Sequence, residues 1–273
     1  MPAWLGWLAV LLLSLYLALW PALATGLARY LAGGDGARLA AALAGTWLLA
    51  EWLRGWVFTG FPWNPLGVVW ISLPPVARVA ALVGTLGLSA LTVLLAGAVP
   101  LLAARRWRAA AALAAPAIVL VAAAQLLPPA PGATGQRITV VQPNIGQDEK
   151  WREGLEAAHR VAHMARSGRP GTAADPRLLL WPEAAVAELL EEEPLVRRAL
   201  TDVLGPRDLL LAGGVALQRN AAGEAVGATN SLFVLDAAGR VRVRYDKAHL
   251  VPYGEYLPMR PLLSLLGLSR LAP

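Results

Sequence analysis

Long apolar runs fill the first half of the chain, and short alternating runs fill the second half. Four apolar runs cover residues 3–27, 39–58, 76–103 and 109–127. Each run is near or above the ~20 residues that cross the hydrocarbon core of a bilayer. They predict a polytopic α-helical membrane domain over residues 1–128. A cleavable signal peptide fits the first run poorly, because no basic residue precedes it and its apolar stretch is too long.

The basic residues between these runs indicate how the runs are oriented. Arginines lie in the first and third connections, whereas the second connection, residues 59–75, carries no charge. Positive connections stay in the cytoplasm, so everything after residue 128 is expected outside it. The same rule places Met1 on the outer side, and we therefore expect further spans upstream of this chain. The arginines concerned are Arg29, Arg38, Arg105, Arg106 and Arg108.

Aromatic residues interleaved with glycine and proline follow the second run. Glu51 and Arg54 precede them, and their i, i+3 spacing permits a pair on one helix face. The aromatic segment allows two interpretations: an interfacial aromatic belt, or a re-entrant loop that lines a lipid-facing cavity. Its aromatic residues are Trp56, Phe58, Phe61, Trp63 and Trp70.

The second half of the chain has the pattern of an α/β domain. A Pro- and Gly-rich linker at residues 129–135 precedes it. Strands alternate with helices and then form a hairpin, which indicates a sheet covered by helices. Helices are expected at residues 148–164 and 188–204. Strands are expected at residues 137–142, 178–181, 209–214, 231–235 and 240–245.

The composition agrees with a membrane half and a soluble half. Of 273 residues, 57% are hydrophobic, which is too many for an ordinary soluble domain. The net charge of +6 does not indicate a nucleic-acid partner, because many arginines lie at the ends of apolar runs, where topology and lipid headgroups explain them. Cysteine is absent, so these residues provide no disulfide, thiolate metal site or thiol nucleophile. There is no phosphate-binding glycine motif, and we expect no cofactor.

Two ionisable residues come directly after predicted strands. Glu183 follows the run LLLWP, and Lys247 follows the last strand. Ligands gather at the carboxyl ends of strands in α/β sheets, so both residues can face one pocket. A glutamate beside a lysine can act as a general base while the ammonium stabilises an oxyanion; a structural salt bridge would have the same spacing. The 24 basic residues include only two lysines, Lys150 and Lys247, which favours a specific need for an ammonium group.

His159 and His163 have the i, i+4 spacing of two metal ligands on one helix face. They lie on an arginine-rich predicted helix, and no acidic third ligand stands nearby. We therefore expect these histidines to lie on a solvated helix face, and we expect no metal site.

Four segments together resemble one protein family. They are WPE at residues 181–183, YDKAHLVPYGEYLP at 245–258, EWLRGWVFTGFPWNPLG at 51–67 and VVQPNIGQDEKW at 140–151. The chain resembles the nitrilase superfamily and, more narrowly, its membrane-bound branch, the apolipoprotein N-acyltransferases. WPE alone is a weak signal, whereas the lysine segment combined with the membrane half is specific.

This resemblance implies an αββα sandwich for the second domain and roles for four of its residues. Glu183 matches the general base, Lys247 the lysine that stabilises the tetrahedral intermediate, and Glu255 a second glutamate that orients and polarises the site. Trp151 matches a tryptophan near the acyl pocket. The family moves an acyl chain from a phospholipid, through a cysteine thioester, to the α-amino group of an apolipoprotein's diacylglyceryl-cysteine. The implied location is the bacterial inner membrane, with the soluble domain facing the periplasm.

The chain departs from the family in having no cysteine. We therefore expect a fragment that is truncated at both ends, with a nitrilase-like domain that is incomplete at its C-terminus and inactive alone. Two other classes stay open. One is a non-catalytic, membrane-anchored homologue that binds lipid or lipoprotein; the other is a nitrilase-type amidase acting on a small substrate.

Overall fold

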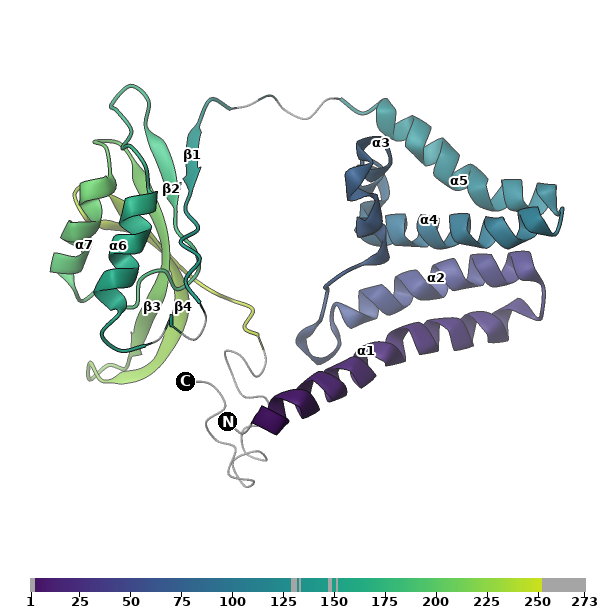
Figure 1. Cartoon of the computed structure of the whole chain (residues 1–273), viewed down its shortest axis with the longest axis horizontal. Helices are drawn as coiled ribbons and strands as arrows, with labels where there is room; N and C mark the ends of the chain where they lie inside the picture. The colour runs from purple at the N-terminus through teal and green to yellow at the C-terminus, as the bar shows by residue number, and fades with distance from the viewer. Residues whose placement is uncertain (1–2, 129–131, 133, 147–148, 151, 252–273) are drawn as a thin grey trace. The chain divides into compact units, whose positions relative to one another are not determined.

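The computed structural model describes residues 3–128, 132, 134–146, 149–150 and 152–251. The chain divides into two compact units, Met1–Ala130 and Pro131–Pro273. The division falls inside the linker expected from the sequence. The first unit is helical and the second contains a sheet with helices (Figure 1). A helical membrane domain followed by an α/β domain was the predicted fold class, and it is confirmed.

Among the described residues, three helical segments of the first unit are long and apolar enough to cross a membrane: Gly6–Ala32, Ala80–Ala103 and Trp107–Gln125. α2 occupies the second expected span but is not among them, because its charged residues lower its mean hydropathy. These apolar helices support a membrane protein. The long helices are α1 (Ala3–Ala32), α2 (Gly36–Arg54), α4 (Ala80–Ala103) and α5 (Trp107–Gln125).

Small residues allow α2 to lie very close to α4. A Cβ built on Gly97 of α4 would be 2.4 Å from the Cβ of Ala40 in α2. Without a hydrophobic driving force in lipid, helices associate through such close packing. Asp35 begins α2 by accepting two N–H bonds of its first turn, and it also forms an ion pair with Arg106 at 3.0 Å. This contact ties the start of α2 to the connection before α5.

The glycine- and proline-rich aromatic segment is folded onto α4. It contains the short helices η1 (Val57–Thr59), η2 (Leu66–Ser72) and α3 (Pro74–Ala77). The Gly67 N–H donates to Ser89 Oγ at 2.8 Å, and Trp70 Nε1 donates to a threonine of α4 at 2.8 Å. A Cβ on Gly67 would be 2.6 Å from a main-chain oxygen of α4. Glycine at this position therefore permits the contact.

Glu51 and Arg54 do not form the pair that their spacing permits. Glu51 Oε1 accepts from Trp47 Nε1 at 3.0 Å and from the Leu66 N–H at 2.7 Å. Arg54 donates to the main-chain oxygen of Trp63 at 2.8 Å. Both charged residues thus hold the aromatic segment. The exposed rings of this segment fit an aromatic belt and a re-entrant loop equally well.

Within its described residues, the second unit contains one five-stranded sheet in the order β1-β2-β3-β4-β5. β1, β2 and β3 pair in parallel, whereas β4 is antiparallel to both β3 and β5. β2 and β5 therefore end at the same edge of the sheet. The strands are β1 (Arg137–Val140), β2 (Arg177–Leu180), β3 (Leu209–Arg219), β4 (Ala225–Asp236) and β5 (Val241–Asp246).

One face of the sheet carries the core and is covered by helices (Figure 1). Alternate residues of each strand point to this face, and the cluster is completed by residues from the segments between strands. The covering elements are α6 (Glu156–Arg166), α7 (Pro194–Leu200) and η3 (Thr201–Val203). The central buried side chains are Leu179, Leu210, Ala212, Phe233 and Leu235.

The two helices that the sequence predicts for this unit begin later than expected. The helix expected from residue 148 begins at Glu156, because Gly154 has a φ of +84° that no helix continues through. The helix expected from residue 188 begins at Pro194, which lacks the N–H that an earlier helical turn would need. β3 and β4 are longer than predicted, since they pair with each other far beyond the core.

The opposite face of the sheet is also apolar, and its side chains are exposed on the two outer strands, β1 and β5. Ile138 and Val140 of β1 and Val243 and Tyr245 of β5 are more than half exposed. The αββα arrangement implied by the resemblance would place a second sheet against this face. The described part of the chain contains one sheet.

A buried ion pair lies at the other end of β2, where the strand begins. Arg177 Nε lies 3.1 Å from Asp208 Oδ2, with side chains 1% and 0% exposed. Asp208 also accepts the N–H groups of Gly171, Gly205 and Arg177 at 2.8 to 2.9 Å. The Arg177 guanidinium donates further to two main-chain oxygens, including that of Val203 at 2.6 Å. This cluster joins the connection before β2 and the connection before β3 to the strand.

Candidate active site

Glu183 and Lys247 meet at the edge of the sheet where β2 and β5 end. Lys247 directly follows β5, and Glu183 lies three residues after β2. The Lys247 Nζ lies 2.9 Å from Glu183 Oε1. Two residues that are 64 positions apart are thus brought together, as their places after two strands indicated.

Asn230 completes this contact, and sequence reasoning missed it. Its Nδ2 donates to the same Glu183 Oε1, and its main-chain oxygen accepts the Lys247 N–H at 2.8 Å. Asn230 lies opposite Val215 in the register of β3 and β4. The available signal was an amide side chain within a mostly apolar strand. One carboxylate oxygen therefore receives an ammonium and an amide donor.

The Glu183–Lys247 ion pair contributes little to folding stability. The Glu183 side chain is 58% exposed and that of Lys247 is 30% exposed. Ion pairs in contact with solvent typically contribute ~0–1 kcal/mol. Stability alone is thus a weak reason for this pair. A carboxylate beside two donors at a strand end also suits proton transfer and oxyanion stabilisation.

The chain around Glu183 is fixed to β3 on both sides. The Trp181 N–H donates to Leu211 at 2.8 Å, the Gly213 N–H to Pro182 at 3.3 Å, and the Val186 N–H to Gly213 at 3.1 Å. A Cβ on Gly213 would be 2.7 Å from the Cα of Glu183. Glycine at position 213 therefore allows the glutamate's backbone to lie directly against the sheet.

Ala184, the residue after Glu183, has a left-handed backbone with a φ of 49°. This conformation is unfavourable for a residue with a Cβ, and surrounding contacts must hold it. The nearby Trp181 is itself held in place, because its buried ring donates from Nε1 to Ser167 Oγ at 3.0 Å. Strained backbone is often found at functional sites.

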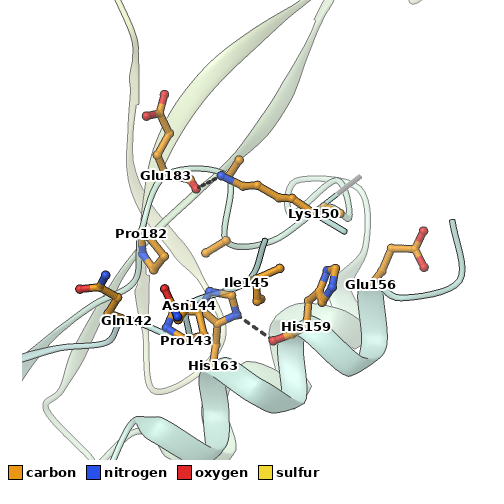
Figure 2. Close-up of a pocket in the computed structure, with 13 residues that line it drawn as sticks. Gln142, Pro143, Asn144, Ile145, Lys150, Glu156, His159, His163, Pro182 and Glu183 are labelled. Carbon is orange, nitrogen blue, oxygen red and sulfur yellow. Dashed lines mark hydrogen bonds between the residues drawn. The ribbon is translucent and has the colours of Figure 1, made fainter. Parts of the chain in front are cut away.

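A pocket of about 200 Å³ lies on the other side of the Glu183 backbone. Figure 2 shows that the Glu183 carboxylate points away from this pocket, whereas its main-chain oxygen faces Lys150. Lys150 Nζ donates to that oxygen at 2.9 Å. The pocket walls come from residues 142–145, from α6 and from residues 182–187. The pocket is therefore not where Glu183 and Lys247 meet.

The prediction that His159 and His163 form a solvated helix face is wrong for His163. His163 is 2% exposed, and its ring lies 5.0 Å from the ring of Trp181. Its Nδ1 donates to the main-chain oxygen of His159 at 2.7 Å. Burial lowers the pKa of His163, so the ring is held neutral. Among the residues described, no three His, Cys, Asp or Glu side chains form a group that could hold a metal.

Asp246, the last residue of β5, anchors the position that precedes Lys247. A hydrogen bond from Ser231 Oγ at 2.7 Å lowers the pKa of Asp246, and Arg244 lowers it further. Asp246 is therefore charged at neutral pH. Two other residues singled out in the sequence, Trp151 and Glu255, lie outside the described residues.

The chain is similar to known proteins along nearly its whole length. Residues 1–98 match the model of the apolipoprotein N-acyltransferase N-terminal domain. Apolipoprotein N-acyltransferases of Allorhizobium ampelinum and Brucella suis are 35% and 36% identical to it, over 98% of this chain and 52% of each relative. That of Bradyrhizobium diazoefficiens is 34% identical, over 98% of this chain and 53% of the relative. The chain thus spans about half the length of these curated relatives. Residues 1–98 are thus similar to the N-terminal domain of apolipoprotein N-acyltransferases, and the chain as a whole is similar to members of that family.

Proposed function

We propose that residues 1–273 form part of an enzyme that N-acylates apolipoproteins. The acyl donor is a phospholipid, and the acceptor is the α-amino group of an N-terminal diacylglyceryl-cysteine. Glu183 is the general base that removes the proton from a cysteine thiol. Lys247 stabilises the oxyanion that forms when the thiolate attacks the ester carbonyl.

The contact between Lys247 Nζ and Glu183 Oε1 at 2.9 Å carries this proposal. The two residues have little stabilising value as an exposed pair, yet the fold holds them together at the carboxyl edge of the sheet. The relatives' name, apolipoprotein N-acyltransferase, supports the reaction class. Apolar helices suit an enzyme whose two substrates are lipids.

Further assignments rest on the resemblance. Glu255 is proposed to orient and polarise the site, and Trp151 to lie near the acyl pocket. Residues 1–128 are proposed as the transmembrane domain, and residues 136–273 as the N-terminal part of a nitrilase-like domain. The reaction uses a cysteine, which these residues do not contain. They would supply the base and the lysine, and the thiol must come from elsewhere.

A chimeric protein tests the proposed function. Residues 1–273 replace the segment that they match in the Brucella suis relative, and the membranes are incubated with labelled phospholipid. The chimera is expected to acquire a hydroxylamine-sensitive acyl label and to pass it to an apolipoprotein. Residues 1–273 alone are expected to acquire none, because a thioester needs a thiol. A label on the unjoined chain would reveal another nucleophile and refute this mechanism. A folded chimera that binds phospholipid without acylation would favour the non-catalytic homologue, and turnover of small soluble amides would favour the amidase.

We also propose that the protein lies in the bacterial inner membrane with its second unit in the periplasm. The basic residues around Arg105 between α4 and α5 support this orientation. A reporter that is active only after export, fused after Gly135, is expected to be active. Activity of a reporter that works only in the cytoplasm, fused at the same position, would reverse the orientation.

A further inference from the structure

Both lysines of the chain contact Glu183, and they do so at different atoms. Lys247 Nζ lies 2.9 Å from the side-chain Oε1, and Lys150 Nζ lies 2.9 Å from the main-chain oxygen. Lys247 comes from the end of β5, whereas Lys150 comes from the connection between β1 and α6. Of the 24 basic residues, the two that carry ammonium groups thus converge on one glutamate.

The main-chain oxygen of Glu183 lies between two backbone hydrogen bonds to β3. The oxygen of Pro182 accepts the Gly213 N–H, and the chain returns to β3 with the N–H of Val186. Between these two bonds, Ala184 holds its left-handed conformation. Lys150 supplies a charged donor to the Glu183 oxygen between these two bonds. A hydrogen bond from a charged donor is stronger than one from a neutral donor.

Lys150 is placed for this contact by its own turn. The N–H groups of Glu149 and Lys150 donate to the main-chain oxygen of Gly146 at 3.1 and 3.0 Å. The side chain then extends along the pocket toward Glu183, as Figure 2 shows. Because the Glu183 carboxylate points the other way, Lys150 does not reach the place where a substrate carbonyl would meet Lys247.

We infer that Lys150 is a positioning residue: it fixes the backbone of Glu183 so that the carboxylate stays against Lys247 and Asn230. This inference rests on the proposed role of Glu183 as the base. Removal of Lys150 releases the Glu183–Ala184 peptide and lets the carboxylate leave its partners. Removal of Lys150 is therefore expected to affect catalysis only by displacing Glu183.

Lysine-selective NMR of the whole chain in detergent micelles tests this. Side-chain ¹⁵N labelling of lysine gives two ammonium signals, because the chain has only Lys150 and Lys247. Lys150→Met keeps the apolar stem and removes the donor. It is expected to speed hydrogen exchange of the Lys247 ammonium about tenfold. A tenfold change corresponds to ~1.4 kcal/mol, which is about the free energy of one hydrogen bond to a charged group. Lys150→Arg, which keeps a donor, is expected to restore slow exchange.

Arg152→Met is the matched control, because it removes an exposed cation two residues away. It is expected to leave the Lys247 signal unchanged, which separates hydrogen bonding from a general loss of charge. Unchanged Lys247 exchange in folded Lys150→Met or Lys150→Gln protein would overturn the inference. Failure of both variants to fold would assign Lys150 to the fold and overturn it equally. The measurement involves no acyl transfer, so a chimera that fails to acylate would refute the proposed function alone.

Discussion

Glutamine at position 183 is expected to slow acyl-enzyme formation in the chimera by about 10²–10⁴-fold, the range for loss of a general base. Glu183→Gln keeps the size of the side chain and an oxygen that can still accept from Lys247 and Asn230. It removes the ability to take a proton from a thiol. The measurement is the rate of thioester formation per milligram of folded, membrane-inserted chimera.

Lys247→Arg is the companion variant. An arginine keeps the positive charge, but its planar fork does not fit where a compact ammonium meets both Glu183 and a developing oxyanion. We expect a loss of order 10²–10³-fold, similar to that for an oxyanion-hole donor. Glu192→Gln is the matched control, because Glu192 forms a similarly exposed ion pair with Arg219, four residues further along β3 than Val215, which lies opposite Asn230. It is expected to acylate at the unchanged rate. If Glu183→Gln and Lys247→Arg also acylate at nearly that rate, the two residues form a structural pair and the active site lies elsewhere.

The meeting of Glu183 and Lys247 could be predicted because it depends on strand direction. Apolar runs with period 2 mark strands, and a polar residue directly after each run marks the strand's end. Once β2 and β5 run in the same direction, both ends lie at one edge. Asn230 could not be predicted in this way. Its place depends on the register of β3 against β4. The strands predicted from the sequence were shorter than β3 and β4, and Asn230 lay outside them.

Contacts to main-chain atoms could not be predicted from side-chain patterns either. Lys150 binds the main-chain oxygen of Glu183, and Glu51 binds the main-chain N–H of Leu66. A spacing of i, i+3 shows only that Glu51 and Arg54 share a helix face. It cannot show that a distant segment offers each of them a better partner.

His163 shows a further limit of local patterns. Neighbouring arginines on α6 indicate a solvated helix, but the tertiary position of Trp181 decides which face of α6 is buried. The aromatic ring of Trp181 covers His163, and a neutral imidazole can be buried at modest cost once one of its nitrogens is hydrogen-bonded. Tertiary packing thus overrode the local charge pattern.

The buried pair of Arg177 and Asp208 makes the second unit sensitive to acid. Burial alone would raise the pKa of Asp208, but the hydrogen bonds from Gly171, Gly205 and Arg177 outweigh it, and the pKa is lowered overall. An aspartate in an unfolded chain has a pKa of about 3.9. The unfolded state therefore binds the proton first as the pH falls. The stabilisation is complete above pH ~4 and is lost as the pH drops toward the folded-state pKa.

Asparagine at position 208 is expected to lower the free energy of unfolding of the second unit by ~3–5 kcal/mol, as for removal of one partner of a buried ion pair. The amide keeps the shape of the carboxylate, but its NH₂ faces donors on Gly171, Gly205 and Arg177, and the guanidinium stays buried without a counter-charge. Hydrogen exchange of peptides from β2 and β3, measured in urea with the whole chain, reports this stability.

Asp175→Asn is the control. The Asp175 side chain is 60% exposed, and its pair with Arg137 is expected to contribute ~1 kcal/mol or less. Asp208→Asn should also flatten the loss of stability below pH ~4, because the group that titrates is gone. Equal stability of the two variants at neutral pH would show that the Arg177 cluster does not hold the loops to β2.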